Sequence, residues 1–255
     1  MSRRTAVFGV VLISQLTGMF LALGLAIARG ESMPAPTDLG WSVLAGTLGV
    51  IGITALYRGL AVGRMGIVAP VTGVLAAVIP VAAGIVLEGL PAPVVLLGIG
   101  LALVAVLLVT RVQNDGGGRS GLGLALLSGT AIGLFGIAIA QISDGEVFGP
   151  LTIVRAVQAT LIVAAILVTR SAWRPPRSLV APIVAVGVAD MAGNALYILA
   201  VQAGALAVAS VVSSLYPVTT VILATVVLHE RVTRSHAAGI VLAAVAIALI
   251  GLGSA

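Results

Sequence analysis

The sequence predicts an all-helical integral membrane protein, and three observations lead to that fold class. Hydrophobic residues make up 60% of the 255 residues and charged residues only 8%, whereas a soluble domain carries roughly a quarter charged residues. Apolar runs of about 20 residues, enough to cross about 30 Å of hydrocarbon as a helix, recur along the chain. The strict apolar–polar alternation of a membrane β-barrel is not seen, and a helix satisfies its backbone hydrogen bonds within the segment.

Nine segments meet the length requirement, so the sequence predicts nine transmembrane helices. The connections between them are short and contain the prolines, glycines and charges that are typical of loops. The predicted segments lie near residues 6 to 28, 41 to 62, 66 to 87, 93 to 110, 121 to 142, 149 to 169, 179 to 200, 204 to 228 and 236 to 253.

The two halves of the chain resemble each other at a shift of about 140 residues, which predicts a tandem duplication. The run LLGIGLALVAVLLV from Leu96 matches HAAGIVLAAVAIALI from His236, and Tyr57 matches Tyr197. We therefore expect an N-terminal repeat over 1–112, a glycine-rich linker over 113–120 and a C-terminal repeat over 121–255. The first repeat contains four segments and the second five, and 6 to 28 matches 149 to 169. The first repeat is thus expected to lack its first helix.

The arginines predict the orientation, because loops rich in basic residues face the cytoplasm. All 13 basic residues are arginines. If all nine segments span, nearly all the loop arginines fall on one side, while Arg29 and most loop carboxylates fall on the other. This predicts an internal N-terminus. It also predicts antiparallel repeats, since a complete repeat has an odd number of spans.

Two stretches resemble a known family of transporters. The sequence from Val188 resembles the last three helices of an EamA-type member of the drug/metabolite transporter superfamily; it reads VADMAGNALYILAVQAGALAVASVVSSLYPVTTVILATVVLHERVTRSHAAGIVLAAVAIALIG. The sequence from Ala55, ALYRGLAVGRMGIVAPVTGVLAAVIPVAAG, resembles the equivalent part of the N-terminal repeat. The resemblance implies two inverted five-helix repeats, a central cavity, and export or exchange of small metabolites. The family has ten helices, so the nine predicted here depart from its pattern.

Asp190 is the sharpest local feature, because it lies in the middle of an apolar segment. With Asn194 and Tyr197 it forms an i, i+4, i+7 series on one helix face. An intramembrane carboxyl group rarely faces lipid, and burial would favour its protonated form, so proton coupling or contact with a cation is one role. A hydrogen-bonded structural tie between two helices is the other.

Other polar residues within the segments have more than one interpretation. Arg155 and Gln158 form an i, i+3 pair, and Arg155 either binds an anionic group of a solute, neutralises Asp190 or extends to the interface. Gln15, with Ser14 and Thr17 beside it, marks a polar patch for which bonding between helices is the favoured role.

Tyrosines, serines and prolines complete the set of candidates. Tyr57 and Tyr197 lie at repeat-equivalent sites near helix ends, where tyrosine either anchors at the interface or contacts a solute. Ser213 and Ser214 are candidate cavity residues. Hinges are predicted at Pro70, Pro80 and Pro217, because proline interrupts a helix; simple packing geometry is the alternative.

The sequence also indicates what the protein does not do. It contains no phosphate-binding loop, zinc motif or cysteine, and its arginines form no basic stripe, so we expect no enzyme activity, cofactor, metal or nucleic-acid partner. The expected partners are the lipid bilayer of an inner membrane and a small-molecule solute, and a homodimer is compatible with the sequence. A flippase for lipid-linked substrates and a non-transporting or degenerate scaffold are the alternative functions.

Overall fold

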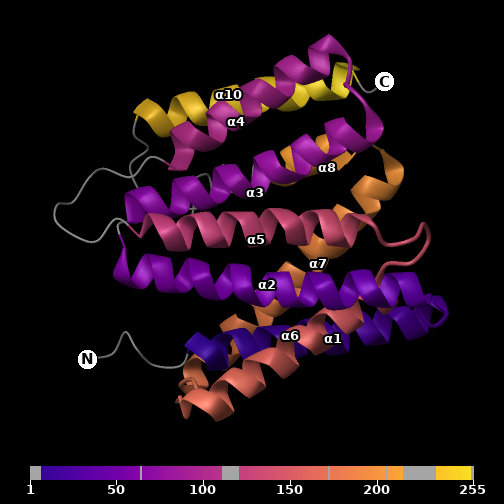
Figure 1. The fold of residues 1–255 in the computed structure, drawn as a ribbon, viewed down its shortest axis with the longest axis vertical. Helices are drawn as coiled ribbons and strands as arrows, with labels where there is room; N and C mark the ends of the chain where they lie inside the picture. Colours follow the sequence, from indigo (N-terminus) through magenta and orange to yellow (C-terminus); the bar gives the residue numbers. More distant parts are fainter. Residues whose placement is uncertain are drawn as a thin grey trace. The chain divides into compact units, whose positions relative to one another are not determined.

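The computed structural model describes residues 7–63, 65–110, 121–171, 173–204, 206–214 and 234–253. These residues form nine α-helices and one short 3₁₀-helix, which confirms the all-helical prediction. In chain order the elements are α1 (Val7–Arg29), α2 (Pro36–Val62), α3 (Met65–Glu88), α4 (Pro93–Thr110), α5 (Leu122–Ala140), α6 (Phe148–Thr169), η1 (Arg177–Leu179), α7 (Val180–Ala203), α8 (Leu206–Ser214) and α10 (Arg234–Gly253) (Figure 1).

The lengths of these helices agree with a multi-pass membrane protein. Two helices, Pro93–Leu108 and Ala237–Ile250, are apolar but shorter than a typical span. The predicted segment 204 to 228 lies mostly outside the described residues, so the count of nine spans stays a prediction. Six helices are long and apolar enough to cross a membrane: Phe8–Arg29, Pro36–Leu60, Val71–Glu88, Leu122–Ala140, Phe148–Thr169 and Arg177–Ala203.

Large apolar side chains remain exposed on every α-helix of the described part. Examples are Ile27 on α1, Leu97 on α4 and Leu167 on α6. In water an apolar surface of this extent would drive association. Its distribution over all the helices fits a molecule whose surrounding solvent is hydrocarbon.

The predicted start of α2 was wrong, because a proline and an aspartate that begin this helix were assigned to the preceding loop. Helix α2 begins at Pro36 rather than near residue 41. Proline suits the first position of a helix, where its missing N–H would have no helical partner, and Asp38 in the first turn suits the positive end of the helix dipole. Helix α1 ends at Arg29, and the next residue, Gly30, has a φ of 65°, which favours glycine. The N–H of Glu31 then donates to the carbonyl of Ala26 at 3.0 Å, which closes the helix.

The chain packs as two compact units, and each is described by itself. Unit 1 contains residues 1–50 and 138–202, and unit 2 contains residues 51–137 and 203–255. Each unit thus combines segments from both predicted repeats. This division follows packing, whereas the repeats follow sequence similarity, so the repeat boundaries stay a prediction.

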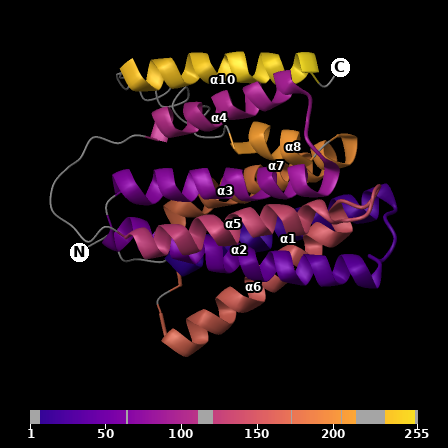
Figure 2. The ribbon, with the colours of Figure 1, turned by 45° about the horizontal axis from the view of Figure 1, so that its top comes forward.

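In unit 1, α1 packs antiparallel to α6 (Figures 1 and 2). The middle of α1 meets the first half of α6, and Val11 and Leu12 near the start of α1 join a core with Ile162 and Ile166 near the end of α6. Helix α7 also approaches α1 closely. A Cβ added to Gly187 would lie only 2.6 Å from the carbonyl oxygen of Ser14, so this contact requires glycine.

In unit 2, α4 packs antiparallel to α10, and α3 packs against α8 (Figure 1). The direction of α4 and α10 follows from two contacts: Gly98 lies against Ile250, and Gly253 lies against Val94. The core of this unit consists of small and β-branched side chains, which allow helices to approach closely in a membrane. It includes Val81, Val95, Ile99, Ala102, Ala105, Val106, Ala207, Val211, Ala243, Ala246 and Ile250.

Candidate functional site

A buried arginine forms the centre of the candidate site. The side chain of Arg155, seven residues after the first residue of α6, is 2% exposed. Its Nη1 donates to Oε1 of Gln15 at 2.5 Å, to Oδ2 of Asp190 at 2.5 Å and to Oε1 of Gln158 at 3.4 Å. We call these four residues, Gln15, Arg155, Gln158 and Asp190, the Arg155 cluster. The structure therefore brings together four of the predicted site residues, from three helices.

The cluster lies well inside its helices rather than at their ends. Gln15 follows the start of α1 by eight residues, and Asp190 follows the start of α7 by ten. At 1.5 Å per residue, these positions lie about 10 to 15 Å from the helix starts. If these helices span the bilayer, the charges lie in hydrocarbon depth, where an unpaired ion is very unfavourable.

The two charged partners differ strongly in exposure. The side chain of Asp190 is 46% exposed, whereas that of Arg155 is almost completely buried. The burial that the sequence argument assigned to Asp190 therefore belongs to Arg155, because α6 is enclosed at this level and the Asp190 face of α7 is not. In a membrane span, contact of this carboxylate with lipid would be unfavourable.

The guanidinium group of Arg155 has unused hydrogen-bonding capacity. Its Nε and Nη2 are buried and have no hydrogen-bond partner among the described residues. These nitrogens carry three N–H groups, and a buried donor without a partner costs about 1 to 3 kcal/mol, more when it is charged. These N–H groups are therefore hydrogen-bond donors that the described residues leave unused.

Neighbouring residues hold the cluster in place. Gly18, one turn after Gln15 on α1, lies beside Arg155, and a Cβ added there would be 3.3 Å from Nε. The close contact of Gly187 with Ser14 sets α7 against α1 one turn before Asp190. The sequence predicted Gln15 to bond between helices, and it does. The hydroxyls of Ser14 and Thr17 instead donate to carbonyls of their own helix, those of Val11 and Ile13.

The polar face of α7 carries Asp190, Asn194 and Tyr197, and the bond of Asn194 stays within the helix. Asn194 donates from Nδ2 to the backbone carbonyl of Asp190 at 3.1 Å rather than to its carboxylate. Tyr197 is half-buried one turn further on. The predicted alignment of the three residues on one face of α7 follows from their helical spacing.

The remaining candidates belong to unit 2. Tyr57 is exposed on α2, Ser213 is exposed on α8, and Ser214 ends α8. Helix α3 continues through both Pro70 and Pro80, so a hinge there stays a prediction. Pro217 lies outside the described residues.

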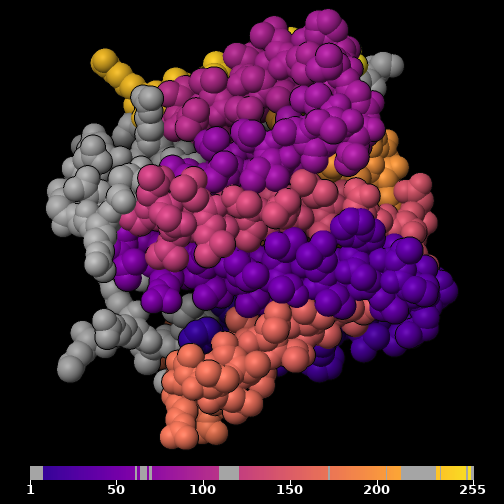
Figure 3. Space-filling model, in the orientation of Figure 1, coloured from indigo at the N-terminus to yellow at the C-terminus, as the bar shows by residue number. Residues whose placement is uncertain are grey.

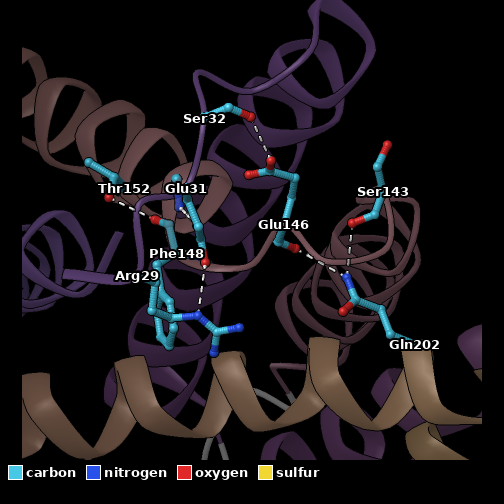
Figure 4. A network of polar contacts seen from close by, with 9 residues as sticks. Arg29, Glu31, Ser32, Ser143, Glu146, Phe148, Thr152 and Gln202 are labelled. Carbon is cyan, nitrogen blue, oxygen red and sulfur yellow. Dashed lines mark hydrogen bonds and ion pairs between the residues drawn. The ribbon is translucent and has the colours of Figure 1, made fainter. Parts of the chain in front are cut away.

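A second polar cluster, which the sequence did not predict, lies at the opposite end of unit 1 from the α6–α7 connection (Figure 4). Both N–H groups at the start of α6, those of Phe148 and Gly149, donate to Oε2 of Glu31 at 2.8 and 2.7 Å. The carboxylate thus satisfies two free donors of a helix terminus and suits its dipole. Arg29 lies 3.8 Å from the other oxygen of Glu31 and over the ring of Phe148.

The α5–α6 loop is held by side chains from two other helices, α2 and α7. Asp38 accepts hydrogen bonds from the N–H and the hydroxyl of Ser143, both at 3.1 Å. Gln202 at the end of α7 donates to the carbonyls of Ser143 and Glu146 (Figure 4). These partners are over 50 residues apart, so no local pattern could reveal them. The one available signal was Asp38, an acidic residue after a proline, which marks a helix start.

Unit 2 contains a comparable cap. Glu88 lies at the end of α3, and Leu206 lies at the start of α8. The N–H of Leu206 donates to both carboxylate oxygens of Glu88, each at 3.0 Å. Among the described residues, no group of three or more His, Asp or Glu side chains could hold a metal ion.

Comparison with known proteins gives a family. The model of the EamA-like transporter family matches residues 119–252, which is more than half of the chain. A solved structure, described only as the crystal structure of a protein, has 17% sequence identity to this chain and a TM-score of 0.80. The alignment covers 97% of this chain and 88% of that one, so the two share a fold. No curated protein matches the sequence.

Proposed function

Because the chain belongs to the EamA-like transporter family, we propose that it moves a small organic solute across the inner membrane by alternating access, as an exporter or exchanger. The solute class is that of amino acids, other metabolites or drug-like molecules. The sequence offers no nucleotide-binding motif, so the driving force is an ion gradient or the exchange of solutes.

The Arg155 cluster is the observation that carries this proposal. A tie between helices in a membrane needs only neutral hydrogen-bonding side chains, and an ion pair there is expensive to desolvate. Among the described residues, this ion pair also leaves two guanidinium nitrogens without hydrogen-bond partners and a carboxylate half exposed. Polar groups with free bonding capacity at mid-helix depth are what a transporter needs to bind a solute.

Many carriers that work by alternating access contain two repeats of opposite orientation, and the pairing of the helices supports such repeats. The alignment of the two repeats matches α1 with α6 and α4 with α10, and these same helices pack against each other. In both pairs the helices run antiparallel, as the contacts of Gly18 with Arg155 and of Gly98 with Ile250 indicate. Repeats of opposite orientation related by an axis in the membrane plane would give this arrangement.

Counterflow tests transport directly. The purified protein in proteoliposomes, preloaded with one unlabelled solute at a time from a metabolite panel, should accumulate the labelled solute above protein-free vesicles, with saturation. A lack of saturable flux for every solute would contradict the proposal. Movement of a labelled polyprenyl lipid in the same vesicles, without solute flux, would favour the flippase instead.

Variants of the cluster separate binding from folding. Asp190→Asn and Arg155→Gln each leave one charge without its partner, but the double variant removes both charges together. We expect the double variant to fold like the wild type and yet to lose at least tenfold in solute flux. Wild-type flux in the double variant would show that the ion pair is a structural tie only.

Proton coupling through Asp190 is part of the proposal and has its own readout. Flux should depend on the pH difference across the membrane in the wild type and become independent of it in Asp190→Asn, because an amide cannot exchange a proton at these pH values. Serine replacement of the exposed Asp144 is the control. An unchanged pH profile in Asp190→Asn would remove Asp190 from proton movement.

A further inference from the structure

The connection between α6 and α7 concentrates positive charge at the surface of unit 1. Arg170, Arg174 and Arg177 are all exposed there, and so is Trp173. We call residues 170–177, of which 172 lies outside the described part, the arginine loop. The guanidinium carbon of Arg174 lies 5.4 Å from the centroid of the Trp173 ring, in the geometry of a cation–π pair.

The charges of the arginine loop are not neutralised within the described part of the chain. The two ion pairs found there join Arg29 to Glu31 and Arg155 to Asp190. The carboxylates of Glu31 and Glu146 lie at the other end of the unit, where Glu31 binds the start of α6. Three arginines within eight residues therefore present a positive surface that no carboxylate of the described residues neutralises, and such a surface attracts anions.

The loop is held against the body of unit 1. A Cβ added to Gly9, near the start of α1, would collide with the carbonyl oxygen of Trp173 and lie 3.1 Å from Cδ of Pro175. The loop thus contacts α1 through the backbone of Trp173 and the ring of Pro175. Figure 3 shows the end of α6, where the loop begins, at the molecular surface.

The position of the loop along the chain gives its environment. The loop joins two candidate spans, Phe148–Thr169 and Arg177–Ala203, so it lies at the level of the lipid headgroups. Tryptophan prefers this level because its ring is apolar and its N–H is polar. Arg170 also suits the negative end of the α6 dipole, so Arg174 and Arg177 are the two arginines assigned to an external anion.

We propose that the arginine loop binds the phosphate headgroup of an anionic phospholipid. A guanidinium group forms paired hydrogen bonds with phosphate oxygens, and the 43% exposed ring of Trp173 would lie at the base of the acyl chains. A free phosphate ion would use the arginines but gain nothing from the tryptophan. The lipid is therefore the favoured source of the phosphate, and this inference does not depend on transport.

The two tryptophans of the chain allow a direct test. Trp41→Phe leaves Trp173 as the sole tryptophan. The protein is placed in nanodiscs of unlabelled phosphatidylcholine. A trace of spin-labelled lipid, either phosphatidylglycerol or phosphatidylcholine with the label near the headgroup, is then added, and quenching of the Trp173 fluorescence is measured for each. We expect the anionic lipid to quench at a concentration about fivefold lower for each arginine that contacts it, as one basic residue contributes at an anionic surface. Added salt should reduce the difference.

Variants show whether the loop itself is responsible. In the Trp41→Phe background, Arg174→Gln with Arg177→Gln should bring the two lipids to equal quenching. Arg174→Lys with Arg177→Lys should retain most of the preference, provided both variants keep the wild-type circular dichroism spectrum. The control, Arg29→Gln with Arg58→Gln, removes the same net charge from other exposed positions and should leave the preference unchanged.

Several outcomes would overturn the inference. Equal quenching by both lipids in the parent protein would show that the loop does not select an anionic lipid. Retention of the preference in the double glutamine variant would assign it to residues outside the loop. Loss of the preference in the control would assign it to net charge. If millimolar inorganic phosphate abolished the difference, the site would be one for a soluble anion.

Discussion

At the scale of single residues, burial determines which partner of the ion pair matters more. The guanidinium group of Arg155 is enclosed, whereas the carboxylate of Asp190 is half exposed. A charge that is left alone in a buried position is much more unfavourable than one that water can reach. The two partners therefore contribute unequally to stability, although each bonds to the other.

This difference predicts the stability of two single variants. Asp190→Asn leaves a buried guanidinium group without its counter-ion, and we expect a loss of about 3 kcal/mol in the free energy of unfolding. Arg155→Gln leaves a half-exposed carboxylate, and we expect a loss of about 1 kcal/mol. Thermal unfolding in detergent, followed by Trp fluorescence, measures both. A larger loss in Arg155→Gln than in Asp190→Asn would contradict the described burial.

At the scale of the helices, a small residue sets the distance between α1 and α7. Gly187 lies against the backbone of α1, so the two helices approach as closely as main chains permit. Gln15 and Asp190 reach the same nitrogen of Arg155 because of this approach. The packing of two helices is therefore a condition for the chemistry of the site.

Glycine substitutions on α7 provide a matched pair. Gly187→Ala would place Cβ 2.6 Å from the oxygen of Ser14, whereas a Cβ on Gly193 would meet no atom within 4 Å. We expect Gly187→Ala to lower the free energy of unfolding by about 1 to 3 kcal/mol, as overpacking does. Gly193→Ala should be neutral or stabilising by up to about 1 kcal/mol, because alanine is the better helix former. Equal effects on the melting temperature would show that α7 does not contact α1 at Gly187.

At the scale of the whole molecule, the distribution of charge predicts an orientation in the membrane. The α6–α7 connection carries Arg170, Arg174 and Arg177, whereas the α5–α6 connection carries Asp144 and Glu146. Basic loops stay in the cytoplasm, so these two connections should lie on opposite sides of the membrane.

The absence of cysteine makes this prediction easy to test. In intact cells, a membrane-impermeant maleimide should label Asp144→Cys, and it should label Ser178→Cys only after the membrane is opened. Both positions are exposed, so access to the reagent depends on the side of the membrane. Labelling of Ser178→Cys in intact cells would reverse the orientation, and labelling of both would contradict a span between them.

The sequence by itself determined the fold class, the family and the identity of the principal polar residues. A charged or amide side chain within an apolar run is conspicuous in any membrane protein, so Gln15, Arg155, Gln158 and Asp190 could be selected without a structure. Helix starts were less predictable: the start of α2 was misplaced because proline and aspartate were assigned to the preceding loop.

Only the tertiary structure decided how these residues are used. It paired Arg155 with Asp190 and Gln15, left two of its nitrogens without partners, and buried the arginine rather than the aspartate. It also connected Glu31 to the start of α6 and Glu88 to the start of α8 across more than 100 residues. Composition and periodicity record what each residue prefers locally. Pairing and burial depend on which helices meet, and these helices lie far apart in the chain.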